Sequence, residues 1–346
     1  MGNHETENHI CFLIYRKIIN KIIIKMKLIS FSKNLVLLIL IALLLVCTKK
    51  PNVIFSEKEN QIDIFFNKRF FTSYHYSYNL VKPVFLPIHS PSGTVLTRGY
   101  PFEEIDGESR DHPHHTGMWF TCDDVNGNHF WNNTEPPPQI LHDRILKIES
   151  DRNEAVLSMV SFWNDSSGKS ILEETRTMVF SFAPVIYTID FTFILKALDI
   201  TVVIRDTKEG LFAIRVADWL NEKDGSGKYA NSKGEVKEAG VWGKRANWMK
   251  LEGKKEGKTY GIVIMNHPNS INYPTYWMAR GYGLFSANPL GQLVYQQYHH
   301  EKEPKELKLT LSPQETATFK FRMVIYEGLF SVETINELFA DYVKLR

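Results

Sequence analysis

Three of the chain's 12 histidines, His112, His114 and His115, lie in the short segment "DHPHH". Imidazole transfers protons near neutral pH and also binds metal ions, so this segment fits an acid/base site, a metal site or a polar corner of the fold. Pro113 favours an extended path that projects His112 and His114 together, with Asp111 and His115 facing elsewhere. No known metal spacing such as H-E-x-x-H is present, so we expect no cofactor, although a divalent metal on the three histidines stays open.

Three further segments combine charged side chains with aromatic ones: "IRDTKEGLFAIRVADWL", "AGVWGKRANWM" and "NHPNSINYPTYWMARGYGLFSANPLG". All seven tryptophans lie between Trp119 and Trp277. Aromatic faces beside polar side chains suit sugar rings, which offer an apolar face and a rim of hydroxyls. The first segment also has the pattern of a half-exposed strand hairpin. Together the segments predict a carbohydrate cleft that includes Lys208, Arg215, Trp242, Lys244, Arg245, His267, Trp277, Arg280 and Asn288.

Short segments of alternating polarity must position these residues. In "QIDIFF", Ile62, Ile64 and Phe66 share one face and Asp63 lies on the other, and "YTIDFTFIL", "TYGIVIM", "LKLTL" and "ATFKFRMVIY" repeat the pattern. Clusters of Gly, Asn and Pro separate them. This arrangement predicts an all-β fold, a large antiparallel β-sandwich. No glycine-rich loop joins a strand to a helix, which argues against dinucleotide-binding and P-loop proteins.

One short helix is expected at the C-terminus, packed on a sheet. Ser331 is a suitable N-cap, and the residues that follow repeat at helical spacing. The apolar stripe consists of Val332, Ile335, Leu338, Phe339, Tyr342 and Val343.

The N-terminal residues have the pattern of an export signal. The apolar run "LVLLILIALLLVC" ends at Cys47, follows three lysines and is shorter than the roughly 20 residues of a spanning helix. A leucine three residues before the cysteine resembles a lipoprotein signal, with Cys47 as the lipidated residue. We therefore expect residues 1–47 to be a signal segment, with 1–25 as an upstream mis-start before Met26. Residues 48–55 would be a tether and 56–346 one domain, exported and lipid-anchored in the cell envelope.

Charge argues against nucleic acid as a partner. The chain has 41 basic and 39 acidic residues, of which six and two precede Cys47, leaving 35 and 37 in the remainder. That remainder has a net charge of −2 and no basic patch interleaved with aromatic residues. Only Cys122 accompanies Cys47 in it, so no disulfide framework is expected within the domain.

Several of these segments resemble a bacterial PmoA-like family that is catalogued as methane oxygenase. The resemblance rests on five sequence motifs between about residues 62 and 328: "RDHPHHTGMWF", "DTKEGLFAIRVAD", "WGKRANW", "ARGYGLFSANPLG" and "FRMVIYEG". The resemblance implies an exported protein of sugar-degrading bacteria and, by analogy, the β-supersandwich of galactose mutarotases. It also implies histidines where this chain has Met278 and Tyr326. Methane oxidation itself is not expected, since a β-patterned body differs from a multi-span membrane protein.

The predicted function is acid/base chemistry on a sugar ring, of isomerase, lyase or hydrolase type. His114 or His115 would be the general acid, beside His112, and Glu209 or Asp111 the base, while arginines hold hydroxyls or a carboxylate. The ligand would be a carbohydrate or a sugar-derived small molecule. The alternative is a glycan-binding lipoprotein without catalysis, in which the same residues only orient the ligand.

Overall fold

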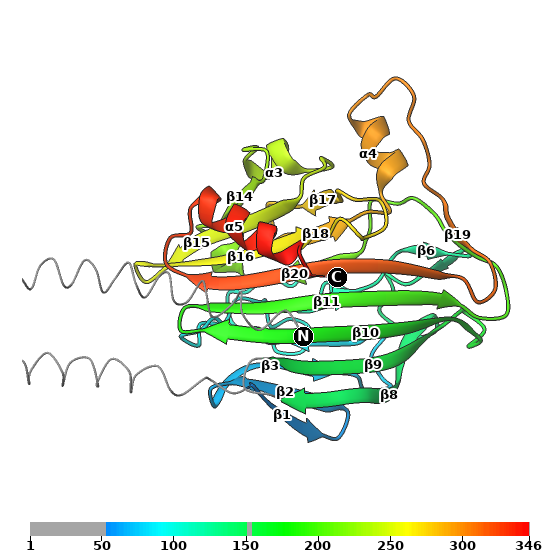
Figure 1. Ribbon diagram of the computed structural model, residues 1–346, viewed down its shortest axis with the longest axis horizontal. Coiled ribbons are helices and arrows are strands. Elements are labelled where there is room, and N and C mark those ends of the chain that lie inside the picture. The colour runs from blue at the N-terminus through cyan, green and yellow to red at the C-terminus, as the bar shows by residue number, and fades with distance from the viewer. Residues whose placement is uncertain (1–52, 151–153, 346) are drawn as a thin grey trace, which may run out of the picture. The chain divides into compact units, whose positions relative to one another are not determined.

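Strands dominate the computed structural model, which describes residues 53–150 and 154–345 (Figure 1). The first eleven strands are β1 (Val53–Lys58), β2 (Gln61–Phe66), β3 (Arg69–His75), β4 (Val84–Leu86), β5 (Met118–Phe120), β6 (Asp124–Val125), β7 (Asn128–His129), β8 (Gln139–Ser150), β9 (Ala155–Asn164), β10 (Ser170–Ala183) and β11 (Ile186–Ala197). The other strands are β12 (Val202–Ile204), β13 (Phe212–Arg215), β14 (Lys228–Asn231), β15 (Trp248–Lys255), β16 (Lys258–Asn266), β17 (Tyr276–Ala279), β18 (Leu284–Asn288), β19 (Leu309–Leu311) and β20 (Thr316–Glu327). The helices are η1 (Asp218–Leu220), α3 (Lys237–Val241), α4 (Gln292–Tyr298) and α5 (Val332–Tyr342).

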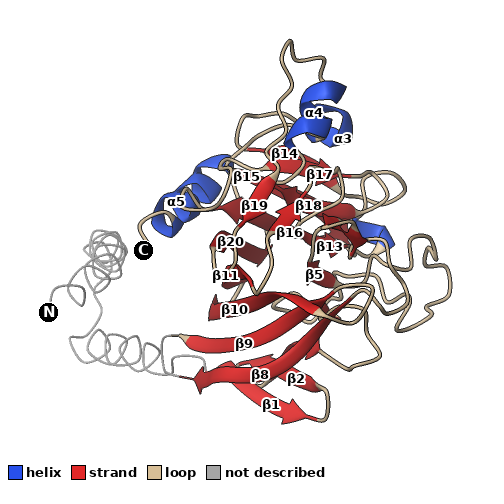
Figure 2. Ribbon diagram, turned by 90° about the vertical axis from the view of Figure 1, so that its right-hand side faces the viewer, coloured by secondary structure: helices blue, strands red, loops and turns tan. Residues whose placement is uncertain are grey.

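Two eight-stranded antiparallel sheets form the body. The first has the order β1-β2-β3-β4-β5-β13-β18-β17, and the second β14-β15-β16-β20-β11-β10-β9-β8. A smaller sheet, β19-β12-β6-β7, accompanies them. The helices lie outside the strands (Figure 2). The predictions of an all-β antiparallel sandwich and of a C-terminal helix are confirmed.

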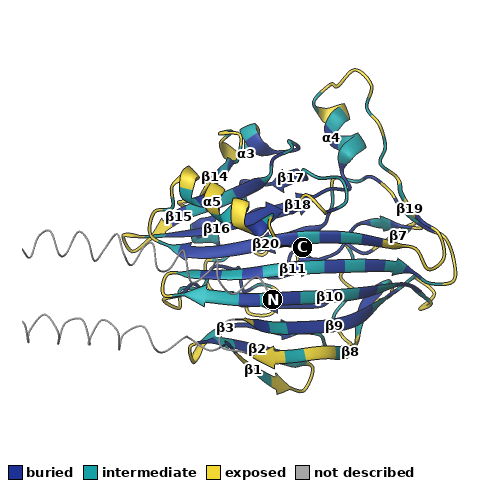
Figure 3. Ribbon diagram, viewed as in Figure 1, coloured by how far each residue is buried: buried dark blue, intermediate teal, exposed yellow. Residues whose placement is uncertain are grey.

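The main core lies between the two large sheets. Along β11 buried and half-buried residues alternate, as the period-2 pattern predicts. Phe120 of the first sheet stacks on Phe193 of the second with ring centroids 3.8 Å apart, and Phe212 stacks on Phe321 at 5.2 Å. Figure 3 shows β16, β17 and β18 largely buried, whereas β1 and β8 carry exposed residues.

The first sheet buries side chains on its other face as well. Trp119, Ala213, Met278 and Leu284 alternate with core-facing neighbours and join a separate apolar cluster with Trp131, Trp242, Tyr276 and Tyr295. Helix α4 supplies Tyr295 to this cluster, and α3 directly precedes Trp242. The strand register thus decides which side chains of the first sheet face the main core and which face away from it. We call the side that faces away from the main core the outer face of the first sheet.

Helix α5 covers the other side of the second sheet. The side chain of Ser331 accepts a hydrogen bond from the Thr334 amide at 3.2 Å, which confirms the expected N-cap. Ile335 and Tyr342 are buried against Trp248, Val324 and Tyr326, whereas Val332 at the start of the stripe is 47% exposed.

The start of the fold differs from the expected boundary. Strand β1 begins at Val53, which is 4% exposed, so residues 53–55 belong to the first sheet although we assigned them to a tether. Residues 53–345 belong to one compact unit. The signal segment and Cys47 lie outside the described residues. Within the described part of the chain, no helix has the length and apolarity to span a membrane.

Candidate functional site

The histidine segment is held in place by a buried arginine. Arg98 donates through Nη1 to the Asp111 carbonyl at 2.7 Å and to its carboxylate at 2.6 Å. Its Nη2 donates to the carbonyls of His112 and His115, both at 3.1 Å. The two terminal nitrogens of one guanidinium group therefore hold the backbone that carries all three histidines.

A second buried arginine closes the same network. Arg215 on β13 donates through Nη2 to Asp111 Oδ1 at 2.6 Å and to Ser109 Oγ at 3.2 Å. Burial tends to raise the pKa of the Asp111 carboxyl, but Arg215, His112 and Arg98 outweigh it and hold that pKa below its usual value. Asp111 is thus an ionised carboxylate bound by two arginines. Because the arginines stabilise its charged form, Asp111 is not favoured as a general base.

Four aromatic rings of the site lie nearly parallel. His115 stacks against His112 with centroids 4.8 Å apart and against Trp119 at 5.5 Å. Tyr282 stacks on His112 at 4.8 Å, and the Arg215 guanidinium lies 4.7 Å from the Tyr282 ring. His112 and His115, which the sequence placed on different sides, therefore share one side.

The buried donors of this face lack protein partners. Neither ring nitrogen of His115, nor Nε and Nη1 of Arg215, nor Nε1 of Trp119 or Trp131 has a hydrogen-bond partner in the described part of the chain. His115 is only 2% exposed, and Arg215 and Trp131 are fully buried. Because buried polar groups in proteins are nearly always hydrogen-bonded, so many together indicate a surface that receives a polar ligand or ordered water.

The structure adds a lysine to this group. Lys82, which precedes β4, is 3% exposed, and its Nζ lies 3.5 Å from the Trp131 carbonyl and 5.9 Å from the Trp119 ring. Burial lowers the pKa of Lys82 to about 7. Burial also lowers the pKa of His114 to about 4, with Lys82 as the next largest cause, and holds the pKa of His115 well below its usual value.

These residues define what we call the outer-face site: Lys82, His112, His114, His115, Trp119, Trp131, Arg215 and Tyr282. His112, His114 and Tyr282 are half-buried, so they form its accessible edge, and the other members form its buried floor. Lys82, Arg98 and Trp131 were missed by the sequence analysis, which identified the segment that contains Tyr282 but did not assign this tyrosine to the site.

Glu209 lies close to this edge. It pairs with Lys208, and its side chain is 14% exposed. Burial raises the pKa of Tyr282 to about 12, and the Glu209 carboxylate adds to that increase. Of the two carboxylates predicted as bases, Glu209 is therefore the one without an arginine pair.

Trp242 and Arg280 form a neighbouring part of the outer face. The Arg280 guanidinium lies 4.9 Å from the Trp242 ring and donates to Glu238 at 3.2 Å. The Trp242 indole Nε1 is another buried donor to which the described residues offer no acceptor. Arg280 also acts on Tyr282, whose pKa it lowers against the effect of burial. These two predicted residues therefore extend the outer face next to the site.

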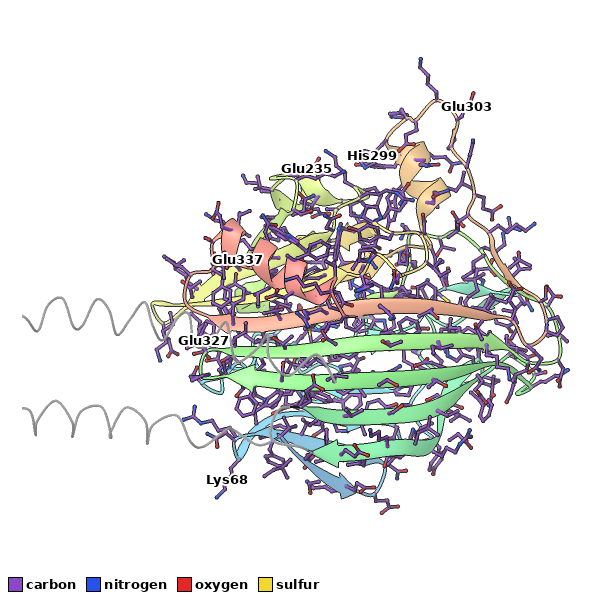
Figure 4. The ribbon with its side chains drawn as sticks, in the orientation of Figure 1. Lys68, Glu235, His299, Glu303, Glu327 and Glu337 are labelled. Atoms are coloured by element: carbon purple, nitrogen blue, oxygen red, sulfur yellow. The ribbon has the colours of Figure 1, made fainter. Side chains whose placement is uncertain are left out.

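Lys244 and Arg245 hold loops together instead. Arg245 donates to the Pro274 carbonyl at 2.9 Å and to the Gln292 side chain at 2.9 Å, which ties β17 to α4. Lys244 pairs with Glu235 at 2.9 Å. Figure 4 labels Glu235 beside α3 and His299 at the end of α4.

Three predicted residues are not brought to the histidines. Trp277 faces the main core and donates to the Ala246 carbonyl at 3.0 Å. Asn288 is fully buried, where it donates to the Thr207 carbonyl at 3.0 Å. His267 lies against Tyr342 of α5, on the second sheet. Each has a structural role that its local sequence does not distinguish from ligand binding.

A metal site is not formed by the histidines. Across residues 53–150 and 154–345 no three His, Cys, Asp or Glu side chains are arranged to hold an ion. A ring nitrogen binds a metal in the plane of its ring, whereas His112 and His115 lie in parallel planes, with 1° between them. The residues present therefore do not fit a three-histidine metal centre.

The chain belongs to a family of unknown function, DUF6807, whose model matches residues 61–340. This finding corrects the family expected from the sequence: the resemblance to a PmoA-like family is wrong. No curated protein matches the sequence.

Solved structures with a similar fold act on sugars according to their names. The galactosidase domain of the α-galactosidase–sucrose kinase AgaSK matches with a TM-score of 0.41 and 8% identity, over 80% of this chain and 41% of that one. A galactose 1-epimerase from Lactobacillus acidophilus NCFM matches with a TM-score of 0.38 and 9% identity, over 82% of this chain and all of that one. The chain thus spans less than half of the galactosidase chain. Scores this low say nothing about chemistry in this protein.

Proposed function

We propose that this protein binds a sugar-type ligand at the outer-face site and catalyses proton transfer on it. The observation that supports this is the convergence of unpartnered buried donors with aromatic faces. His115 and Arg215 offer N–H groups, and Trp119 and Trp131 offer flat apolar surfaces beside their own N–H groups. A sugar ring matches both features, because it presents C–H groups on its face and hydroxyls around its edge.

The proposed proton acceptor is His114. Its pKa of about 4 leaves the imidazole neutral at neutral pH, with a free lone pair at the accessible edge of the site. The same lowering does not favour His114 or His115 as general acids, so His114 is proposed as a base and not as the acid that the sequence suggested. The Tyr282 hydroxyl, whose pKa burial raises to about 12, is the proposed proton donor at the same edge. The reaction class is isomerase, lyase or hydrolase.

The alternative is a glycan-binding protein without catalysis. The observation in its favour is that Asp111 and Glu209, the carboxylates nearest the histidines, are both engaged in ion pairs. Binding without turnover in the experiment below would support this alternative.

We also propose that the protein is exported and anchored through a lipid on Cys47. The support is the sequence pattern: an apolar run preceded by lysines and ended by a cysteine.

The experiment compares two histidine variants of the full chain. His114→Ala should weaken sugar binding by about 1–3 kcal/mol or abolish turnover, and should change the melting temperature little because His114 is half-buried. His267→Ala is the matched control, since His267 packs against α5 away from the site. It should lower the melting temperature and leave binding unchanged. A His114→Ala protein that melts far lower but binds sugars normally would refute the proposal.

A further inference from the structure

The outer-face site holds more positive than negative charge. The Asp111 carboxylate beside it accepts hydrogen bonds from Arg98 and Arg215, both at 2.6 Å. The Asp218 carboxylate, which accepts from Ser109, also raises the pKa of Arg215, so two carboxylates face the two arginines. Lys82 has no such carboxylate among the described residues, so its ammonium form is the unpaired charge of the site. Arg215 also keeps Nε and Nη1 free of partners among the described residues.

Lys82 is poorly satisfied for a buried amine. Among the described residues, its one contact within hydrogen-bonding reach is the Trp131 carbonyl at 3.5 Å, the long limit for such a bond. Burial is the cause that lowers its pKa, and no carboxylate in that part of the chain raises it. The titratable groups that face Lys82 are His114 and His115, whose pKa values it lowers. A buried ammonium group without an anion lowers the stability of the fold. A lysine at this position therefore has a role other than stabilisation.

Both cations act on the same ring. Lys82 and Arg215 each lower the pKa of His115, which lies between the Trp119 ring and the accessible edge. The one N–H of neutral His115, the free Arg215 nitrogens and the Lys82 amine are therefore donors around the same ring. A neutral sugar hydroxyl would use these donors but would leave the positive charge uncompensated.

We propose that the ligand of the outer-face site is an anionic sugar, whose carboxylate or sulfate ester is received by Lys82 and Arg215. This inference rests on the proposed sugar-binding function and deepens it, because it names the substrate class. An anion stabilises the ammonium form of Lys82 and accepts hydrogen bonds from the free nitrogens of Arg215 and from the one N–H of His115. Carboxylates and sulfate esters share this chemistry, since both present several acceptor oxygens with negative charge.

The test measures binding of matched sugars by ligand-observed NMR. The probes are glucose, galactose and mannose, the three corresponding uronates, and the three corresponding 6-sulfates, all with the full chain at low salt. At least one anionic sugar should bind about tenfold or more tightly than its neutral counterpart. A preferred uronate would identify the carboxylate as the anion, and a preferred 6-sulfate would identify the ester. Either result supports the inference.

Lys82→Met is the decisive variant, because it keeps the length of the side chain and removes its charge. It should weaken binding of the anionic sugar by about ten- to a hundredfold and leave binding of neutral sugars within about threefold. Its melting temperature should equal or exceed that of the parent, because an unpaired buried amine is replaced by an apolar group. Lys147→Met on β8, where the side chain is exposed and pairs with Glu149, is the control and should change neither property.

The outcomes separate this inference from the proposed function. Neutral sugars that bind as tightly as anionic ones, or an anionic sugar whose affinity survives Lys82→Met, would overturn the inference and leave the sugar-binding function standing. Failure of every probe to bind would overturn both.

Discussion

The ring of His115 lies parallel to that of His112, with centroids 4.8 Å apart, and both nitrogens of the inner ring lack partners in the described residues. The pair combines an accessible imidazole with a buried one. The backbone carbonyls of both residues accept hydrogen bonds from Arg98, which holds the backbone that carries the two rings. A polar group that is buried, rigid and unpaired is typical of a binding site, because it lowers stability unless a ligand uses it.

Replacing His115 by phenylalanine should separate stability from binding. The substitution keeps a ring between His112 and Trp119 and removes two unpartnered nitrogens, so the free energy of unfolding should stay the same or rise by about 1 kcal/mol. Sugar binding should be lost. Urea denaturation measures the first effect and ligand titration the second. Retained binding with a large loss of stability would show that His115 is part of the core instead.

Arg98 should be among the most important residues for the stability of this face. Arg98→Met removes hydrogen bonds to four groups of the histidine segment and leaves Asp111 with one arginine, so we expect a loss of about 3–5 kcal/mol in unfolding free energy. Arg110→Met is the control, because Arg110 and its partner Glu104 are more than half exposed. It should cost less than about 1 kcal/mol. Equal losses for the two variants would contradict this account.

The sequence predicts the strands better than the site. Alternation of polarity identifies β11 and β20 because one face of each is buried, and the cap at Ser331 identifies α5. Trp277 and Met278 are neighbours on β17, however, and only the register of that strand decides that the methionine faces outward.

Long-range contacts explain the residues that were missed. Lys82 precedes a proline and a short strand, and nothing in that segment indicates burial beneath Trp131, which lies 49 positions later. Tyr282 reaches the site because β17 and β18 form a hairpin in the sheet that also contains β5. The histidine cluster itself was found because its three members lie within four positions of the sequence.

Cys47 should carry the lipid if the export proposal is correct. Cells that express the full chain with a palmitate analogue should label it, and Cys47→Ala should abolish the label. Cys122→Ala is the matched control, since Cys122 is free but buried and should not contribute. Label that persists in Cys47→Ala would contradict lipidation at this residue.

Stability should fall in mild acid because of the outer-face histidines. Burial lowers the pKa of His114 from 6.5 to about 4 and that of His115 further. In the unfolded chain both take up protons below their ordinary pKa of 6.5, whereas in the folded state they stay neutral until a lower pH. The stability that they contribute is therefore complete above pH 6.5 and is lost as the pH falls toward the folded pKa values.

The measurement compares unfolding free energies of the parent and of His115→Phe at several pH values. Four other histidines with lowered pKa values, His75, His89, His142 and His267, act in the same direction in both proteins and cancel in the difference. The difference should favour His115→Phe increasingly from about pH 6.5 downward, by about 1–3 kcal/mol near pH 4.5. His300→Asn, at an exposed position, should follow the parent at every pH. Parallel pH profiles for the parent and His115→Phe would contradict this prediction. They would show that the buried ring takes up its proton as readily in the folded state as in the unfolded state, so that His115 is not held neutral at the floor of the site.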